Sequence, residues 1–567
     1  MTGQKDQEVR IGVFVCHCGS NIGGVVDCAA LAEYASTLPN VAHAEHNLYT
    51  CSEVGLSRIK EAVVEHDLNR VVVASCTPRT HEPLFRETIN EAGLNPYLFE
   101  MVNIRDQCTW VHMKEPDKAF EKAKDLIRMG VGKAAHLEPL EKYRVDVVPA
   151  AAVVGGGIAG MTAALSLARQ GFEVHVVERQ NELGGTLRLL HEVYPGGKAA
   201  SQILEERLAA IEADSNVHVH LSTTIKEVHG FVGNFTLLLE GPGGESHLTV
   251  GAVVLATGGK VLSAGEVAGE LPEFAGERVI DQVELERRMK EGSVDAKDVV
   301  MIQCAGARNE KRPYCSNTCC LVAVKNALAL KRASPDVNVT VLYRDVQLLG
   351  TKYETLYRQA RKAGVLFVRY APPNLPETRS DMVVVQNELL GEKVGIRSDL
   401  VVLSTPTVAH DDTRDLAQLF KVPVGNGGFL LEAHVKLRPV DFATDGVFVC
   451  GTARWPSDVS ECVAQGYAAA SRASRILSHP TFEVEGAVAN IPERDKSLCV
   501  GCEVCIKVCP FGAIKKNEQG EVEVISVLCK GCGTCVSTCP HHALTIFHFT
   551  NEQILSQIAA LAGRSAR

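Results

Sequence analysis

The stretch Val153-Val154-Gly155-Gly156-Gly157-Ile158-Ala159-Gly160 decides the fold of the central part of this chain of 567 residues. The apolar residues 147–154 predict a strand that enters a glycine turn, and a helix and a second strand at residues 172–178 follow. Gly155, Gly157 and Gly160 fit the pattern G-x-G-x-x-G, in which the backbone approaches a pyrophosphate at a helix N-terminus. Glu178 ends the second strand, where a carboxylate accepts hydrogen bonds from ribose hydroxyls. This order of features predicts a βαβ dinucleotide-binding unit rather than a glycine turn that serves only helix packing.

Later glycine segments favour FAD over a nicotinamide cofactor. The first segment follows Glu178. The second ends an apolar strand in Thr-Gly-Gly, and the third ends a late strand in Cys-Gly. They resemble segments of flavoproteins with two dinucleotide-binding domains, such as thioredoxin reductase. The residues that carry this resemblance are Gly184, Gly185, Thr257, Gly258 and Gly451. The resemblance implies a bound FAD and a helix at residues 461–470 whose N-terminus is directed toward the flavin ring.

A second dinucleotide turn would follow the strand expected at residues 298–303. The residues found there are Cys304-Ala305-Gly306-Ala307-Arg308, which do not form G-x-G-x-x-G. The sequence therefore predicts no nicotinamide site.

Cysteines are the strongest signal in the composition, because 20 are present and none lies between Cys108 and Cys304. Two motifs near the end of the chain, each C-x2-C-x2-C-x3-C-P, have the spacing of ferredoxins with two 4Fe–4S clusters. In such domains the fourth cysteine of each motif binds the cluster of the other motif. A zinc ribbon would need only four ligands and no closing proline. The predicted ligands are Cys499, Cys502, Cys505 and Cys539 for one cluster, and Cys529, Cys532, Cys535 and Cys509 for the other.

A further group of cysteines lies between a predicted strand and a helix that is expected to begin near residue 317. Its members are Cys304, Cys315, Cys319 and Cys320. Adjacent ligands are uncommon in zinc sites, and helix amides favour a negatively charged cluster, so iron–sulfur binding is favoured over zinc. From the spacing alone, a redox-active dithiol and a set of buried unreactive thiols remain alternatives.

This middle group, the segment Phe14-Val15-Cys16-His17-Cys18-Gly19 and the terminal motifs together resemble the HdrA family, the A-type subunits of heterodisulfide reductase, over nearly the whole chain. The resemblance implies that the middle group binds a 4Fe–4S cluster near the flavin. It also implies that Lys325, five residues past the cysteine pair, contacts the flavin ring, where a cation stabilises an anionic reduced flavin. The alternative for Lys325 is a solvated helix lysine. An N-terminal cluster is implied as well.

The first part of the chain has the pattern of a small α/β domain. Residues 10–15, 45–50 and 70–75 predict strands, and residues 54–66 and 83–92 predict helices. If the strands are parallel, the cysteines that follow them meet at one edge of the sheet. We therefore assign the N-terminal cluster to Cys16, Cys18, Cys51 and Cys76, with redox-active or structural thiols as the alternative. The cysteines without a pattern are interpreted as core residues: Cys28, Cys108, Cys450 and Cys462.

The expected fold class is α/β with three domains. An N-terminal α/β cluster domain at residues 1–143 precedes a thioredoxin-reductase-like FAD domain at residues 144–480, which contains the cysteine-rich loop 304–320. A ferredoxin-like α+β domain at residues 481–567 follows, and its first part, residues 481–496, is expected to be a linker. The net charge of −10 and the absence of a basic run argue against a nucleic-acid partner. No apolar run is long enough to cross a membrane and residues 1–10 do not resemble a signal peptide, so a cytoplasmic protein is expected.

Residues 200–298 contain no cysteine, so the ferredoxin domain inserted in methanogen members of this family is expected to be absent. The resemblance implies flavin-based electron bifurcation or confurcation by a homodimer within a larger complex. The implied partners are ferredoxin, HdrB-like and HdrC-like subunits of heterodisulfide reductase, and a hydrogenase or dehydrogenase component that supplies electrons. Two other functions remain open: a relay component that only passes electrons onward, and an NAD(P)H-dependent reductase of ferredoxin or disulfides.

Overall fold

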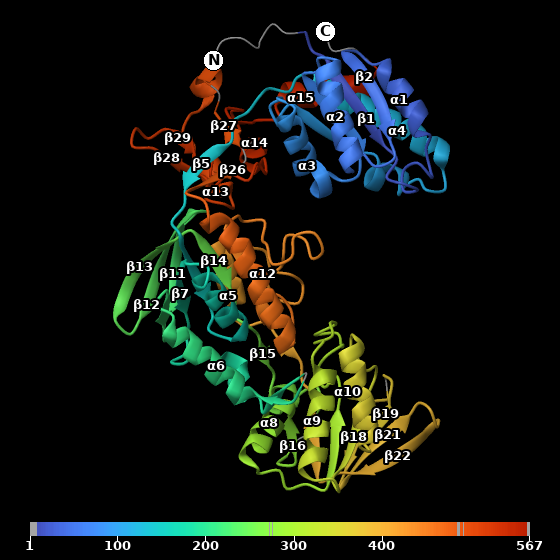
Figure 1. The fold of residues 1–567 in the computed structure, drawn as a ribbon, viewed down its shortest axis with the longest axis vertical. Helices are drawn as coiled ribbons and strands as arrows, with labels where there is room; N and C mark the ends of the chain where they lie inside the picture. The colour runs from blue at the N-terminus through green and yellow to red at the C-terminus, as the bar shows by residue number, and fades with distance from the viewer. Residues whose placement is uncertain are drawn as a thin grey trace. The chain divides into compact units, whose positions relative to one another are not determined.

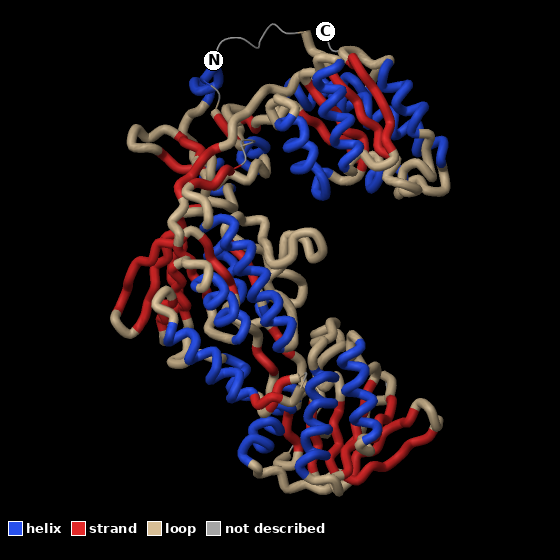
Figure 2. The backbone as a smooth tube through the Cα atoms, viewed as in Figure 1, coloured by secondary structure: helices blue, strands red, loops and turns tan. Residues whose placement is uncertain are grey.

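The computed structural model describes residues 8–563 apart from residues 195, 272, 275, 373, 485–487 and 492. The chain forms two compact units (Figure 1, Figure 2). Unit 1 joins the part of the chain before Val145 with the part from Glu483 onward, and unit 2 contains Val145–Phe482. Within the described ranges, no helix has both the length and the apolar character needed to cross a membrane.

The N-terminal part of unit 1 is an α/β domain. Its strands are β1 (Ile11–Cys16), β2 (Val41–Asn47), β3 (Arg70–Ser75) and β4 (Phe99–Asn103), and its helices are α1 (Cys28–Ser36), α2 (Glu53–Glu65), α3 (Pro78–Glu91) and α4 (Pro116–Ala134). The strands form a parallel sheet in the order β2-β1-β3-β4. Because side chains alternate along a strand, Val13 and Val15 face α1 and α4, whereas Phe14 faces α2 and α3 (Figure 1).

The strands of this domain pair in parallel, as the assignment of the N-terminal cysteines requires. The second strand covers Val41–Asn47 instead of residues 45–50, and the sequence pattern does not reveal α1 and β4. Strand β2 is at the edge of the sheet and most of its side chains are half-exposed, so its sequence shows little hydrophobic alternation.

The remaining part of unit 1 and the boundary between the units contain short elements. These are β5 (Tyr143–Asp146), β26 (Thr481–Val484), β27 (Ala489–Asn490), α13 (Val504–Val508), β28 (Ile514–Lys516), β29 (Val522–Val524), α14 (Thr534–Thr538), β30 (Thr545–Ile546) and α15 (Asn551–Leu561). Strand β26 pairs with β5, β27 with β30, and β28 with β29. The segment expected to be a linker therefore contributes strands β26 and β27.

Helix α15 packs along α4 within unit 1. A Cβ added to Gly132 of α4 would lie 3.1 Å from the Cβ of Ala560 of α15, so the helices are in close contact. Beside this contact, the Nζ of the buried Lys133 lies 2.7 Å from Glu100 Oε2, and His548 Nε2 lies 3.6 Å from the same oxygen. Burial alone would raise the pKa of Glu100, but the neighbouring His548 and the charge of Lys133 lower the pKa below its ordinary value. An ionised Glu100 thus holds the α15 segment against the N-terminal domain.

The first half of unit 2 is a three-layer arrangement. Its elements are the strands β6 (Ala150–Val154), β7 (Glu173–Val177), β10 (Val217–His220), β14 (Ala252–Leu255) and β25 (Val447–Val449), the strands β11 (Thr224–Phe231), β12 (Asn234–Gly241) and β13 (Gly244–Val250), and the helices α5 (Ile158–Ala168) and α12 (Val459–Leu477). A parallel sheet has the order β10-β7-β6-β14-β25. Helices α5 and α12 pack together on one face, and the antiparallel sheet β11-β12-β13 covers the other (Figure 1).

The second half of unit 2 repeats this plan. Its elements are the strands β16 (Val279–Asp281), β17 (Asp298–Ile302), β18 (Asn338–Tyr343), β19 (Leu366–Arg369) and β23 (Leu400–Leu403), the strands β20 (Glu377–Arg379), β21 (Met382–Asn387) and β22 (Glu392–Arg397), and the helices α8 (Gln282–Glu291), α9 (Cys319–Ala333) and α10 (Thr351–Lys362). The parallel sheet has the order β16-β23-β17-β18-β19. The three helices share a core with one face of this sheet, and β20-β21-β22 covers the other face.

Smaller elements complete unit 2. They are the 3₁₀ turn η2 (Gly185–Leu189), β8 (Glu192–Val193), β9 (Lys198–Ala199), α6 (Ala200–Ala213), β15 (Lys260–Val261), α7 (Ala264–Val267), β24 (Thr407–Val408) and α11 (Thr413–Phe420).

We expect Glu100→Gln to loosen α15 from α4, because the change leaves the buried Lys133, and His548 just before α15, without an ionised partner. Breaking a buried ion pair costs about 3–5 kcal/mol, so the amides of α15 should exchange with deuterium about a hundredfold faster or more. Hydrogen-exchange mass spectrometry of the full chain measures this rate. Glu121→Gln, which breaks an exposed ion pair with Lys124 on α4, is the control and should change little. Unchanged exchange of α15 in the Glu100 variant would contradict the prediction.

Candidate functional site

The glycine turn lies between β6 and α5, at the carboxyl edge of the first parallel sheet of unit 2. A Cβ on Gly155 would lie 2.4 Å from the carbonyl oxygen of Ala256, and a Cβ on Gly160 would lie 1.9 Å from that of Gly155. Both positions therefore require glycine for packing. By contrast, nothing lies within 4 Å of a Cβ at Gly157, the N-cap residue of α5. Open space thus faces the first amides of the helix, where a pyrophosphate fits against the backbone.

Glu178 follows β7, and its carboxylate is held against this turn. Its Oε2 accepts a hydrogen bond from the N–H of Gly156 at 2.6 Å, and its Oε1 accepts one from the N–H of Gln180 at 2.8 Å. The side chain is buried. The carboxylate therefore lies beside the glycine turn, on the side where the sequence analysis expects a ribose.

The other residues expected to bind FAD come from segments at the same edge. The Gly184 N–H donates to the carbonyl oxygen of Gly156 at 2.8 Å, and Gly185 begins the 3₁₀ turn η2. Thr257 and Gly258 follow β14, and Gly451 follows β25, the next strand of the sheet. Like Gly157, Gly258 has nothing within 4 Å of an added Cβ. The arrangement fits FAD, and the role of each of these residues stays a prediction.

The structure brings the middle cysteine group together. Cys304 follows β17, Cys315 lies in the next loop, and Cys319 and Cys320 form the first turn of α9. Burial raises the pKa of Cys304, Cys319 and Cys320, and other thiols of the group raise each of these pKa values further, that of Cys320 to about 11. The four thiols are therefore near neighbours. The helix begins at Cys319, two residues later than expected, so Cys315 lies in the loop before it.

Lys325 lies in α9 and is buried, so its interpretation as a solvated helix lysine is wrong. Its Nζ donates a hydrogen bond to the carbonyl oxygen of Glu192 at 2.9 Å and forms an ion pair with Glu286 Oε1 at 2.6 Å. The side chain of Glu286 is 1% exposed. A buried positive charge therefore lies between the helix and the chain segment that follows Gly184 and Gly185, balanced by a buried carboxylate.

The N-terminal cysteines also meet, because the strands that they follow are neighbours in a parallel sheet. Cys16 ends β1, Cys18 lies two residues later, Cys51 follows β2 and Cys76 follows β3. The Cys16 Sγ accepts hydrogen bonds from the N–H groups of Cys18 at 3.3 Å and Thr50 at 3.4 Å. Burial raises the pKa of Cys51 and Cys76, and the Cys16 and Cys18 thiols raise both further. Four clustered thiols, one of them hydrogen-bonded by backbone amides, fit an iron–sulfur cluster, whose sulfurs accept such bonds.

The cysteines interpreted as core residues are all buried: Cys28, Cys108, Cys450 and Cys462. The Cys108 thiol donates to the carbonyl oxygen of Ala119 at 3.1 Å and thus has a structural partner. Cys28 lies near the N-terminal group, since burial and the Cys16 thiol raise its pKa to about 12.

The ferredoxin-type cysteines line cavities in the sets that the sequence analysis expects. One cavity is lined by Cys509, Cys529, Cys532 and Cys535, and another by Cys499, Cys502, Cys505 and Cys539. Each cavity therefore combines three thiols of one motif with the fourth of the other. In the part of the chain that the structure describes, no three His, Cys, Asp or Glu side chains are placed to hold one metal ion. In a cubane cluster each thiolate binds a different iron atom, so its four ligands do not meet at a single ion.

Sequence reasoning missed the charged partners of these sites. Glu286 pairs with Lys325, and Arg308 and Arg344 oppose the rise in the pKa of Cys304 that burial causes. In the N-terminal domain, Arg105 Nη1 donates a hydrogen bond to Cys18 Sγ at 3.3 Å. Arg308 lies in the same loop as Cys304, four residues later. The sequence holds no local signal for the other contacts, because their partners come from different elements.

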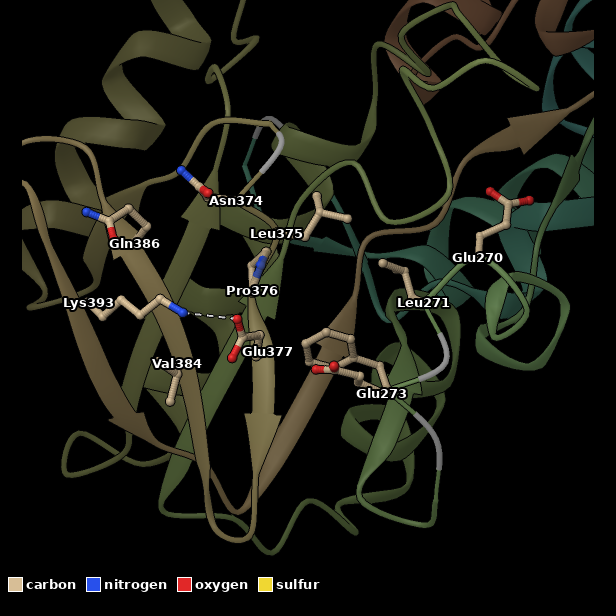
Figure 3. A pocket seen from close by; sticks show the side chains of 11 residues that line it. Glu270, Leu271, Glu273, Asn374, Leu375, Pro376, Glu377, Val384, Gln386 and Lys393 are labelled. Atoms are coloured by element: carbon tan, nitrogen blue, oxygen red, sulfur yellow. Dashed lines mark hydrogen bonds and ion pairs between the residues drawn. The ribbon is translucent and has the colours of Figure 1, made fainter.

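A pocket of about 330 Å³ lies elsewhere in unit 2 (Figure 3). Its described lining includes Glu270, Phe274, Glu377 and Lys393 and none of the site residues that the sequence predicts. Lys393 Nζ pairs with Glu377 Oε1 at 3.2 Å, as the dashed line in Figure 3 marks.

Comparison with known proteins agrees with this arrangement. Residues 149–466 match the family model of pyridine nucleotide-disulphide oxidoreductases, and residues 491–540 match that of the 4Fe-4S dicluster domain. The solved structure of thioredoxin reductase from T. acidophilum aligns with a TM-score of 0.40 and 16% identity over 57% of this chain and 97% of that chain.

The similarity to curated relatives is much closer. An A-type iron-sulfur subunit of CoB–CoM heterodisulfide reductase from Methanopyrus kandleri is 37% identical over 91% of this chain and 92% of its own length. The A-type subunit of the H(2):CoB-CoM heterodisulfide,ferredoxin reductase of Methanothermobacter thermautotrophicus is 37% identical over 99% of this chain and 98% of its own length. That alignment spans 656 positions and is longer than this chain, so the relative contains residues that have no counterpart here.

The family models identify a flavoprotein-type oxidoreductase domain and an iron–sulfur dicluster domain, and the relatives match the chain over nearly its whole length. The chain therefore belongs to the HdrA family of oxidoreductases, the A-type subunits of heterodisulfide reductase.

Proposed function

We propose that this chain is the electron-bifurcating or confurcating component of a heterodisulfide-reductase-like complex. It binds FAD, two ferredoxin-type 4Fe–4S clusters, a middle cluster and an N-terminal cluster. The form of the protein is the one that lacks the inserted ferredoxin domain, since residues 200–298 contain no cysteine.

The position of α9 is the observation that best supports this proposal. The helix begins with Cys319 and Cys320, and five residues later Lys325 donates to the carbonyl oxygen of Glu192. Arg332, near the end of the same helix, pairs with the Glu192 carboxylate at 2.5–2.6 Å. Glu192 belongs to the segment that follows the glycines of the FAD site. One helix thus joins the middle cysteine group to the half of unit 2 that fits FAD.

Bound FAD exchanges electrons in pairs or singly, whereas iron–sulfur clusters exchange one at a time, and bifurcation depends on this difference. The residues of the chain hold and surround the FAD and the clusters. The amides at Gly157 bind the pyrophosphate and Glu178 binds the ribose. Lys325 contacts the flavin ring and places a buried positive charge there, and Glu286 holds this lysine in position.

The middle cysteine group holds the cluster nearest the flavin, and the ferredoxin-type groups connect to ferredoxin or to another component of the complex. One electron of each pair goes to a low-potential acceptor such as ferredoxin, and the other to a disulfide or a similar acceptor. The partners are HdrB-like and HdrC-like subunits and a hydrogenase or dehydrogenase component that supplies electrons. The chain acts as a homodimer within this complex, in the cytoplasm. The Methanothermobacter relative supports this assignment, because its name includes hydrogen, a heterodisulfide and ferredoxin.

A second candidate function is an NAD(P)H-dependent reductase, which the match to the pyridine nucleotide-disulphide oxidoreductase model favours. Against it, the segment after β17 contains Cys304 and Gly306 instead of a dinucleotide turn. A relay component, in which FAD only passes electrons onward, would use the same residues.

Anaerobic titration with electron donors separates these functions. We expect reduced ferredoxin to bleach the absorbance of the flavin and the clusters, and NADH alone to leave both unchanged, because the second parallel sheet carries cysteines where a nicotinamide turn would lie. Rapid bleaching by NADH alone would favour the reductase. Bifurcation and relay are separated by a test on the reconstituted complex. A bifurcating complex reduces ferredoxin only while a second acceptor is reduced.

Gly157→Ala should weaken FAD binding without disturbing the fold. The backbone at this residue (φ −73°) suits alanine and nothing lies near the new methyl group, but this group fills the space where the pyrophosphate approaches. We expect the Kd for FAD, measured by quenching of flavin fluorescence, to rise about tenfold or more. Gly243→Ala, also in open space, is the control. Equal affinity in the Gly157 variant and the wild type would show that the pyrophosphate lies elsewhere.

Cys319→Ser should remove the middle cluster and leave FAD in place. The proposed clusters contain about sixteen iron atoms per chain, and the variant should retain about twelve, because one thiolate ligand of the middle cluster is lost. Iron analysis under anaerobic conditions measures this. Cys108→Ser, which alters a buried thiol bound to Ala119, should retain the full iron content. A content near eight iron atoms in the wild type would leave only the ferredoxin-type clusters. An unchanged iron content in the Cys319 variant would exclude Cys319 as a ligand.

A further inference from the structure

Arg105 occupies an unusual position beside the N-terminal cysteine group. It follows β4 and begins a short π-helix, Arg105–Thr109, at the edge of the sheet where Cys16, Cys51 and Cys76 also lie. Its Nη1 donates a hydrogen bond to Cys18 Sγ at 3.3 Å, and its side chain is 17% exposed. A guanidinium ion is therefore held, largely out of solvent, against one of the four thiols.

The neighbours of Arg105 fix this geometry. The guanidinium carbon lies 4.7 Å from the centre of the Trp110 ring, and Trp110 Nε1 donates to Asn21 Oδ1 at 3.3 Å. The Asn21 side chain in turn donates to the carbonyl oxygen of Cys18 at 3.1 Å. These contacts tie the π-helix to the loop that carries Cys18. Asp106, 3.4 Å from Arg105 Nε, offsets part of the positive charge.

Arg105 lies near more than one of the strand ends that carry these thiols. Strand β4, which precedes it, pairs in parallel with β3, and Cys76 follows β3. Arginine stays protonated under all ordinary conditions, so the positive charge is permanent.

A permanent positive charge has a defined effect on a cluster at this place. Four thiolates give a 4Fe–4S cluster a net negative charge, and one-electron reduction adds a further negative charge without making or breaking a bond. A buried cation stabilises the reduced form more than the oxidised form, because Coulomb interactions are strong where water is excluded. Hydrogen bonds to cluster sulfurs act in the same direction.

We propose that Arg105 raises the reduction potential of the N-terminal cluster by acting through Cys18. It is a positioning residue for electron transfer, because the raised potential favours the reduced form of this cluster. The inference rests on the N-terminal cluster of the proposed function. It adds the residue that tunes the reduction potential of that cluster.

The test is a redox titration of the full chain, followed by electron paramagnetic resonance under anaerobic conditions. Cys51→Ser first identifies the signal of the N-terminal cluster as the one that it abolishes. In Arg105→Gln this signal should titrate at a more negative potential, whereas the other signals stay where they are. Arg105→Lys keeps a charge but loses the planar donor, so it should shift the signal in the same direction by less.

Arg86→Gln is a matched control. Like Arg105, Arg86 is a largely buried arginine of the same domain and has a carboxylate partner, Glu82. Its guanidinium carbon lies 5.0 Å from the centre of the Tyr97 ring. This variant should leave every potential unchanged.

The possible outcomes separate the inference from the proposed function. Unchanged potentials in Arg105 variants with full iron content would overturn the role of Arg105 and leave the cluster in place. Loss of about four irons from both Arg105 variants would overturn it too, because Arg105 would then serve only to hold the cysteines. If only Arg105→Gln loses iron, Arg105→Lys tests the inference. A more negative potential of the N-terminal signal in that variant supports it, and an unchanged potential overturns it. Full iron content in Cys51→Ser, with no signal lost, would instead show that the four thiols assigned to the N-terminal cluster do not hold it, and would overturn the inference together with that assignment.

Discussion

Parallel pairing of strands is the constraint on which the candidate sites depend. In a parallel sheet every strand ends at the same edge, where ligands of α/β proteins bind. Cys16 and Cys76 follow neighbouring strands of unit 1, and the glycine turn and Gly451 follow strands of one sheet in unit 2. Cys304 follows the central strand of the second sheet. Backbone amides at such ends lack strand partners and can bond to a pyrophosphate or to cluster sulfur.

Buried positive charges accompany these edges, and their partners differ. Lys325 is balanced by a carboxylate, that of Glu286, so the pair is neutral as a whole. Arg105 faces thiols, and the nearby Asp106 offsets only part of its charge. An isolated buried charge is costly and is retained where it has a partner. The partners of Lys325 and Arg105 belong to the sites proposed for the flavin and for an iron–sulfur cluster.

Local patterns made much of the fold and of the sites predictable. Gly155, Gly157 and Gly160 act through backbone geometry within a few residues, and the cysteine motifs act through fixed spacing, so both are visible in the sequence. The bounds of strand β2 and the existence of helix α1 were not visible, because an edge strand with half-exposed side chains and a helix rich in small residues show weak periodicity. The environment of Lys325 was equally hidden: a lysine in a helix reads as solvated unless its buried acidic partner is known.

The sequence by itself determined the βαβ dinucleotide turn, the ferredoxin-type ligand sets and the membership of the middle cysteine group, because each of these depends on residues close together in the chain. Only the tertiary structure decided which distant groups meet. Arg105 reaches Cys18 across 87 positions, and Lys325 reaches Glu286 across 39 and Glu192 across 133. Such contacts follow from the order of strands in a sheet and the packing of helices on it, and no local pattern of residues specifies them.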